Sequence, residues 1–570
     1  MTHDLLVRGG LVVDGSGGPR RPADVAVDDG RIVAVGRGLG PARRVVEAEG
    51  RIVAPGFVDV HTHLDVQGFW DPMLTPSPLH GVTTALGGNC GFTVAPLDGD
   101  AAPYLMRMLA KVEGMPLTSL ERGVPWDWGT TAEFLDRLEG RLALNTGFSV
   151  GHSALRRVVM GPDATERHAT PDELAAMLRL LHDGLSAGAL GFSSTWSPAH
   201  NDHDGRPVPS RAAAPSELVA LAAACRDHPG TSLEFLAGAG EWDAATRDVI
   251  VDMSVAAGRP LNWNVISGTA ESLDRWLDKL AVSDLARARG GKVVGLALPR
   301  SPAARFCMRS GFALDALVGW DAAMALPDDE KLALLTDPDG RRRLAEDADR
   351  PSAYRHLADW GGYRIMETFS PDTERFEGRV VADIARDLDK DPFDALVDIV
   401  VADELRTSFC IARPDDTADD WAARARLWRD PRVVVGASDA GAHLDMLTTY
   451  TYPTDLLGLA VREHGLLGVE EAVRMLTAEP AELYGLRDRG VLRPGAWADV
   501  VVFDQDEVGP GEITTRFDLP GGAGRLYAGA DGVGHVIVNG VPIVEDGELT
   551  ASTPGRVLRA GRDTATPSLD

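Results

Sequence analysis

The sequence predicts an α/β fold, with a (β/α)8 TIM-like barrel at its centre and a small composite β-sandwich formed from the N- and C-terminal segments. The central part of the chain alternates short apolar segments with amphipathic helices, a pattern typical of parallel βα units. Both ends instead contain short strands of alternating apolar residues, closed by Gly or Asp-Gly turns. A length of 570 residues is sufficient for both parts.

The two ends of the chain both contain short predicted strands that are closed by turns. Residues 4–54 read as short strands in DLLVRGGLVVDG, DVAVDDGRIVAVG and RVVEAEGRIVAPG, and residues 490–550 repeat this texture in GVLRPGAWADVVVFD and HVIVNGVPIVEDGELT. Neither end alone has enough strands for a stable sandwich, so we expect them to pair with each other. The sequence therefore predicts a composite β-sandwich domain from residues 1–54 and 486–570, and a barrel domain from residues 55–485.

Eight apolar segments of the central part are predicted to be the barrel strands. They are residues 57–63, 82–87, 146–151, 188–193, 231–236, 260–266, 293–298 and 433–438. Between them lie helical segments such as residues 171–188, where apolar residues recur every three or four positions. Two stretches do not fit the short connections of a minimal barrel, namely residues 97–140 and about 300–430. We expect these two insertions to cover the carboxyl end of the barrel, where barrel active sites are assembled.

Two histidines, His61 and His63, stand at the end of the first predicted strand. Alternate side chains of a strand share a face, so Asp59, His61 and His63 are expected to point the same way. The second predicted strand runs towards Cys90, 27 residues after His63. Imidazoles and a thiol at neighbouring strand ends are potential metal ligands, whereas surface or core histidines are the structural alternative. The sequence predicts a metal site at His61, His63 and Cys90.

Further polar residues stand at the ends of the other predicted strands, and the barrel topology makes them converge. They are His152, Ser193, Ser194, Glu234, Asn264 and Asp439. Asp439, opposite the two histidines, is placed to take a proton from a metal-activated water. An aspartate after a strand also commonly caps a helix, and this alternative stays open.

Composition narrows the range of partners. The formal net charge of −28 argues against a nucleic acid or an anionic membrane. The first residues, MTHDLLVRGG, lack the pattern of a secretory signal, and no stretch approaches 18 apolar residues. Four widely spaced cysteines are expected to be free thiols. We therefore expect a cytoplasmic protein with a small-molecule substrate; formation of a homo-oligomer is left open.

Several longer motifs resemble the D-aminoacylase, or N-acyl-D-amino-acid deacylase, branch of the amidohydrolase superfamily. These motifs are PGFVDVHTH, HGVTTALGGNCGF, GHSALRRVVMG, GALGFSST, SDAGAH and the tail DLPGGAGRL, VIVNG and PGRVLR, so they cover nearly the whole chain. The resemblance implies a metal-dependent hydrolase that cleaves a C–N amide bond. It also implies that His61, His63 and Cys90 are zinc ligands and that Asp439 is the general acid/base.

The chain departs from the family pattern at the fifth and sixth predicted strands. Family deacylases carry a metal-binding histidine at the end of each of these strands, where this chain has Glu234 and Asn264. Glutamate is a competent zinc ligand and asparagine a poor one, so we expect Glu234 to bind metal and one or two ions to be held. His200, His203 or His443 could compensate, although such histidines are more often partners of ligands.

The predicted substrate-binding residues are His152, Ser194, Arg211, Asn264 and His443. The Arg211 guanidinium matches a substrate carboxylate, but it could instead hold the loop of residues 198–215. Two other functions remain open, namely hydrolysis of a cyclic amide or lactone and a catalytically silent binding protein. Metal analysis separates the enzyme from the silent homologue.

Overall fold

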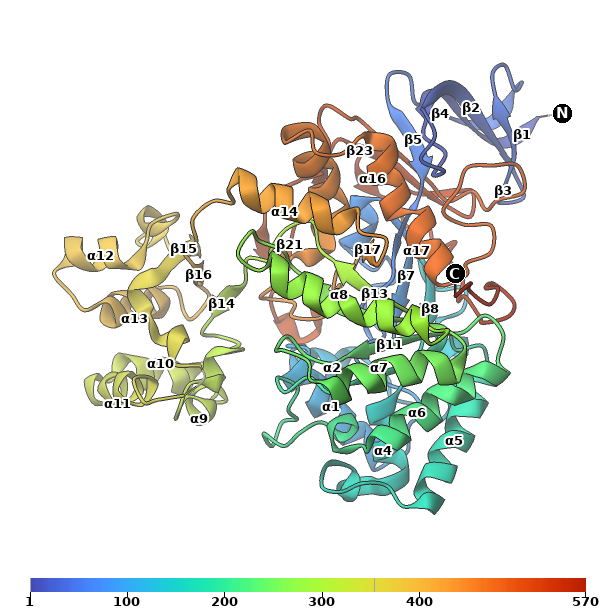
Figure 1. Cartoon of the computed structure of the whole chain (residues 1–570). Coiled ribbons are helices and arrows are strands. Elements are labelled where there is room, and N and C mark those ends of the chain that lie inside the picture. Colours follow the sequence, from blue (N-terminus) through green and yellow to red (C-terminus); the bar gives the residue numbers. More distant parts are fainter. Residues whose placement is uncertain (1, 353, 570) are drawn as a thin grey trace.

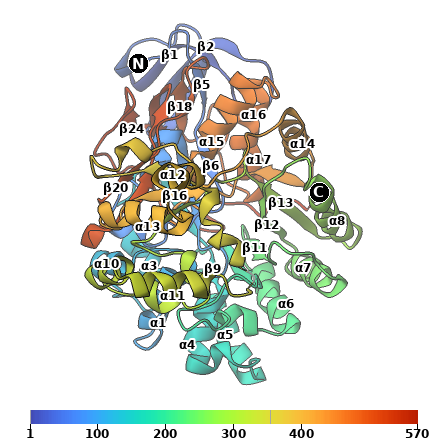
Figure 2. The ribbon, with the colours of Figure 1, turned by 90° about the vertical axis from the view of Figure 1, so that its left-hand side faces the viewer.

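The computed structural model describes residues 2–352 and 354–569 of the chain. Figure 1 shows a large α/β body, a sheet beside it that contains the N-terminal strands, and a helical lobe on the far side, drawn in yellow and olive. The view in Figure 2 brings this lobe to the front of the molecule.

Strands from both ends of the chain form one nine-stranded sheet. Its central contact joins β5 (Ile52–Pro55) to β18 (Val500–Phe503), which run antiparallel with Val501 opposite Ala54. The remaining strands are β1 (His3–Val12), β2 (Arg21–Asp28), β3 (Arg31–Gly36), β4 (Ala42–Glu47), β23 (Val533–Val538), β24 (Val541–Glu545) and β25 (Glu548–Leu549). Val25, Val53 and Val500 are fully buried in one apolar cluster, so the two chain ends share a core.

The central strands are parallel and overlap the segments predicted from the sequence, although β10 (Gly191–Thr195) begins and ends later than the predicted residues 188–193. One sheet has the order β6-β7-β8 and the other the order β17-β13-β12-β11-β10-β9. Their bounds are β6 (Phe57–Asp59), β7 (Val82–Gly87), β8 (Asn145–Phe148), β9 (Val150–Gly151), β10 (Gly191–Thr195), β11 (Ser232–Leu236), β12 (Pro260–Ile266), β13 (Lys292–Ala297) and β17 (Val433–Val435). Only Ser149 separates β8 from β9. The other two edges meet just beyond β6 and β17, where Thr62 pairs with Ala440.

The first of these strands is shorter than predicted. β6 ends at Asp59 rather than at residue 63, because the backbone that follows divides its hydrogen bonds between two neighbours. Thr62 N–H donates to Leu86 O at 3.0 Å, whereas His63 N–H donates to Ala440 O at 2.7 Å. His61 and His63 therefore lie in a short segment that bridges the ends of two strands, and not within a strand.

Helices that cover the parallel strands have clear start and stop signals. α5 (Pro171–Ser186) begins at Thr170 with a capping box to Glu173 and buries Met177 and Leu181. α7 (Ala244–Ala257) begins at Asp243, and Gly258 ends it in a left-handed conformation. The other covering helices are α4 (His152–Met160), α6 (Pro215–Ala224), α8 (Leu273–Ala288), α14 (Ala418–Trp428) and α16 (Val469–Leu476). Among the described residues, no helix is long and apolar enough to cross a membrane.

Two excursions depart from the regular βα alternation. The first contains α1 (Ala101–Val112), α2 (Leu117–Gly123) and α3 (Thr131–Leu138). The second is the lobe at the left of Figure 1, with an antiparallel sheet of β14 (Arg305–Cys307), β16 (Ser408–Ile411) and β15 (Tyr363–Glu367). Its helices are α9 (Asp321–Met324), α10 (Asp328–Thr336), α11 (Pro338–Ala348), α12 (Val381–Leu388) and α13 (Pro392–Ala402). Trp320, Tyr363 and Phe409 belong to a separate apolar cluster within it.

Candidate metal centre

His61, His63 and Cys90 come together at the carboxyl ends of the parallel strands. Their candidate ligand atoms all lie within 4.8 Å of one another, and all three side chains are buried. His61 Nε2 is 3.6 Å from Cys90 Sγ, and the two imidazole rings are 5.5 Å apart and nearly perpendicular. Two imidazole nitrogens and one sulfur are a donor set that fits zinc, which holds three protein ligands in catalytic sites.

Asp439 contacts both histidines. Its Oδ1 lies 3.2 Å from His61 Nε2 and 3.7 Å from His63 Nε2. Its side chain is 23% exposed, whereas those of His61 and His63 are at most 3% exposed, so Asp439 faces the solvent side of the group. The next helical turn, η10 (Thr449–Thr451), begins ten residues later, which gives no support to the helix-cap alternative. Burial opposes ionisation, but hydrogen bonds to His61 and His63 outweigh it and lower the pKa of Asp439.

Glu234, in the middle of β11, contacts the backbone of Cys90. Its Oε2 accepts the Cys90 N–H at 2.8 Å, while Oε1 is buried without a hydrogen-bond partner. No lysine or arginine of the described chain forms an ion pair with it, so the alternative of a buried arginine partner has no support. Burial raises the pKa of Glu234 to about 8.

The candidate centre is rich in buried acidic groups. Burial raises the pKa of the Cys90 thiol well above its usual range, and the carboxylates of Glu234 and Glu113 raise it further. A thiol must lose its proton to bind a metal, and a bound cation is what favours that loss. The charges around Cys90 are therefore those expected of a site that holds a cation.

Asn264, at the end of β12, touches the same group. Its Nδ2 is 3.2 Å from His61 Nε2 and 4.0 Å from Cys90 Sγ, and its Oδ1 is buried without a partner. Asn264 therefore contacts two of the three candidate ligands directly. A contact with substrate stays a prediction.

His152 and Ser194 belong to a buried polar network. His152 Nδ1 is 2.8 Å from Ser194 Oγ, and its Nε2 is 2.9 Å from Glu217 Oε1. Arg156 Nη1 donates to both oxygens of Glu217, at 2.6 and 2.7 Å. Since both ring nitrogens of His152 have protein partners, these contacts favour a structural role, and substrate binding by His152 and Ser194 stays a prediction.

Arg211 lies in the short helical turn η4 (Pro209–Ala212), and His443 lies in the loop that follows Asp439. Arg211 Nη1 donates to His200 O at 2.9 Å and to Asn201 Oδ1 at 2.6 Å, so the guanidinium holds the loop, as in the structural alternative. His443 lies four residues after Asp439, and its Nδ1 is buried without a partner. His200 instead contacts Thr195, and His203 contacts Arg107, so neither belongs to the group of three.

Glu113 also faces the candidate centre and was not predicted from the sequence. This residue follows α1 in the first excursion and is 3% exposed, and its Oε1 lies 3.5 Å from His63 Nδ1. Its only signal in the sequence is a single acid within the stretch KVEGMPL. A signal of that kind does not indicate which part of the fold the side chain will reach.

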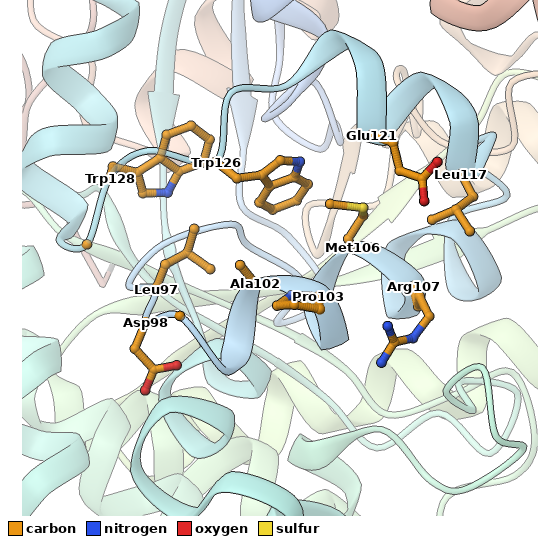
Figure 3. A pocket seen from close by; sticks show the side chains of 12 residues that line it. Leu97, Asp98, Ala102, Pro103, Met106, Arg107, Leu117, Glu121, Trp126 and Trp128 are labelled. Carbon is orange, nitrogen blue, oxygen red and sulfur yellow. The ribbon is translucent and has the colours of Figure 1, made fainter.

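Two cavities open near this first excursion. One, of about 530 Å³, is lined by Gly114, Phe312 and Asp445, together with Lys111 and Arg309. It lies next to the candidate centre, because Gly114 adjoins Glu113 and the Phe312 ring is 5.2 Å from that of His443. The other, of about 650 Å³, lies between α1, α2 and the indoles of Trp126 and Trp128 (Figure 3). None of the predicted site residues lines this second cavity.

Comparison with known proteins identifies the family. A model of the amidohydrolase family matches residues 44–334 and 381–544. N-acyl-D-glutamate deacylase of Alcaligenes xylosoxydans xylosoxydans is 31% identical over 98% of this chain and 96% of that protein. D-aminoacylase of the same organism is 28% identical over 97% of each chain. This chain belongs to the amidohydrolase family.

Solved structures give the same relationship. A D-aminoacylase mutant in complex with CuCl2 superposes with a TM-score of 0.66 at 26% identity, covering 98% of this chain and 100% of that one. N-acyl-D-glutamate deacylase from Bordetella bronchiseptica, in complex with zinc and a phosphonate inhibitor, gives a TM-score of 0.65 at 28% identity with the same coverage.

Proposed function

We propose that this protein is a metal-dependent N-acyl-D-amino-acid deacylase, which hydrolyses the C–N amide bond of a small-molecule substrate. The observation that carries the proposal is the buried group of His61, His63 and Cys90, with Asp439 in contact with both histidines. Two relatives that match this chain over nearly its full length are an N-acyl-D-glutamate deacylase and an N-acyl-D-aspartate deacylase, and one solved relative is in complex with zinc.

In the proposed mechanism, His61, His63 and Cys90 hold a zinc ion. When bound, zinc lowers the pKa of water and polarises a carbonyl oxygen. Asp439 is ionised at neutral pH because its pKa is lowered, so it has an oxygen available to accept a proton. Because the Asp439 side chain is more exposed than that of His61, it is placed to deliver that proton to the leaving amine.

Substrate screening tests the reaction class. We expect hydrolysis of N-acyl-D-amino acids with kcat/KM at least about 10²-fold above that of the L-isomers, which corresponds to about 2.7 kcal/mol of discrimination. The measurement is amine release from paired D and L substrates, with chelator-treated protein as the control. Equal rates for both isomers, or turnover of cyclic amides or lactones alone, would contradict the proposed substrate class.

Glu234 is proposed as a further metal ligand through its unpartnered oxygen Oε1. Glu234→Gln is expected to lower the metal content while largely keeping the fold, because an amide is a poorer ligand than a carboxylate. Metal content and thermal unfolding are measured on the same samples. Glu217→Gln is the matched control, since Glu217 pairs with Arg156 and should lose stability at unchanged metal content. Full metal content and full activity in Glu234→Gln would argue against a ligand role.

We also propose a division of the chain into a barrel domain and a β-sandwich domain. The two parallel sheets meet at Ser149 and at the Thr62–Ala440 bridge, which supports a closed (β/α)8 barrel within residues 55–485. The mixed nine-stranded sheet supports a composite β-sandwich domain from residues 1–54 and 486–570. In this division, the stretches 97–140 and 300–430 are insertions into the barrel.

A further inference from the structure

We propose that Glu113, supplied by the excursion that contains α1 rather than by a parallel strand, positions the His63 imidazole for metal binding. The inference rests on the proposed function, because it concerns the same candidate metal centre. It assigns a role to a residue outside the candidate ligand group.

Backbone contacts fix the place of Glu113. Its N–H donates to Leu109 O at 2.9 Å as α1 ends, and its carbonyl oxygen accepts the His443 N–H at 2.5 Å. The next residue, Gly114, has a φ of +57°, and a Cβ there would lie 3.3 Å from the His443 Cα. A glycine therefore permits α1 to end against the loop that carries Asp439, with the Glu113 side chain turned inwards.

The two nitrogens of His63 face two different carboxylates. Nδ1 is 3.5 Å from Glu113 Oε1, and Nε2 is 3.7 Å from Asp439 Oδ1. Nδ1 is buried and forms no hydrogen bond within the described chain, so Glu113 is the acid that faces it, at ion-pair distance. Within residues 2–352 and 354–569, the Glu113 carboxylate forms its ion pair with His63. The Glu113 side chain is only 4% exposed. A charge at such depth is costly unless it is paired, so the contact with His63 explains how a glutamate is tolerated at this position.

The chemistry of imidazole gives this pair a function. A neutral ring has one N–H and one lone pair, so a proton held on Nδ1 by Glu113 leaves the lone pair on Nε2. Nε2 is the atom that faces Asp439, on the side where the ligand group converges. A carboxylate behind a ligating histidine fixes the ring and increases its basicity, and loss of such a partner typically weakens metal affinity about 10- to 100-fold.

Competition for zinc with a chelator tests the proposal. Glu113→Ala is expected to bind zinc about 10- to 100-fold more weakly than the wild type, and Glu113→Gln to lose less, because its amide oxygen still accepts a hydrogen bond. Glu121→Ala is the matched control, since Glu121 is an exposed glutamate of α2 beside the separate cavity (Figure 3). Thermal unfolding shows whether each variant is folded. Equal zinc affinity in Glu113→Ala and the wild type would overturn the inference.

Two further measurements separate positioning from other roles. In a His63→Cys background, which keeps a third zinc ligand but has no imidazole, Glu113→Ala should cause no additional loss of zinc affinity, because its effect acts through the imidazole of His63; an additive loss contradicts the inference. At saturating Co²⁺, the visible absorption of Glu113→Ala should match that of the wild type, whereas altered band intensities would make Glu113 a ligand and overturn the positioning role. A wild-type protein that binds no zinc would remove the proposed function, and this inference with it.

Discussion

Replacement of His61 by alanine is expected to remove the bound metal and reduce turnover by at least about 10³-fold. His61 is the centre of the ligand group, since its Nε2 lies 3.6 Å from Cys90 Sγ and 3.2 Å from Asp439 Oδ1. Loss of this ligand removes one of the two imidazoles and leaves the buried group of three, whose donor set fits a catalytic zinc site, incomplete. The metal supplies several kcal/mol of transition-state stabilisation, and each 1.36 kcal/mol corresponds to a factor of ten in rate. Elemental analysis and amine release are measured on the same preparation.

A remote histidine provides the control for this experiment. His182, in α5, lies 2.9 Å from His228 and is outside the candidate group, so His182→Ala should keep both metal and activity. Metal retained at wild-type stoichiometry in His61→Ala would count against His61 as a ligand. Loss of metal with full turnover would instead remove the metal from the mechanism.

The positions of the parallel strands could be predicted because each is a short apolar run between turn or helix signals. β12 lies within the predicted residues 260–266, and β7 within residues 82–87. The end of β6 could not be predicted, because it depends on Thr62 and His63 choosing different backbone partners across the fold. Hydrophobic periodicity indicates which residues are buried and says little about which neighbouring strand receives each N–H.

The residues of the candidate site could likewise be predicted only in part. His61, His63, Cys90 and Asp439 could be placed together because topology alone brings parallel strand ends to one side. Glu113 comes from a helical excursion, whose path over that side depends on tertiary packing such as the contact between Gly114 and His443. The partners of His152 and Arg211 were also beyond prediction, since Glu217 and Asn201 meet them only after their loops and helices have packed.

Asp439→Asn is expected to lower turnover by about 10² to 10⁴ while leaving the metal content unchanged. Asparagine has nearly the same shape but cannot take up and release a proton. In the wild type, the lowered pKa of Asp439 keeps its carboxylate ionised beside His61 and His63 at neutral pH. The measurement is kcat at saturating substrate, together with elemental analysis, so that loss of chemistry is separated from loss of metal.

The matched control for Asp439→Asn is a fully buried aspartate in the helical lobe. Asp403 is fully buried and accepts hydrogen bonds from the hydroxyls of Thr373 and Thr407, so Asp403→Asn should lower the thermal stability without lowering kcat of the folded protein. Near-normal turnover in Asp439→Asn would remove Asp439 from the mechanism. A fall in turnover that tracks a fall in metal content would make Asp439 a metal ligand instead of a proton shuttle, because zinc also accepts carboxylate oxygens. A fall in turnover at full metal content is the result that only a proton-transfer role predicts.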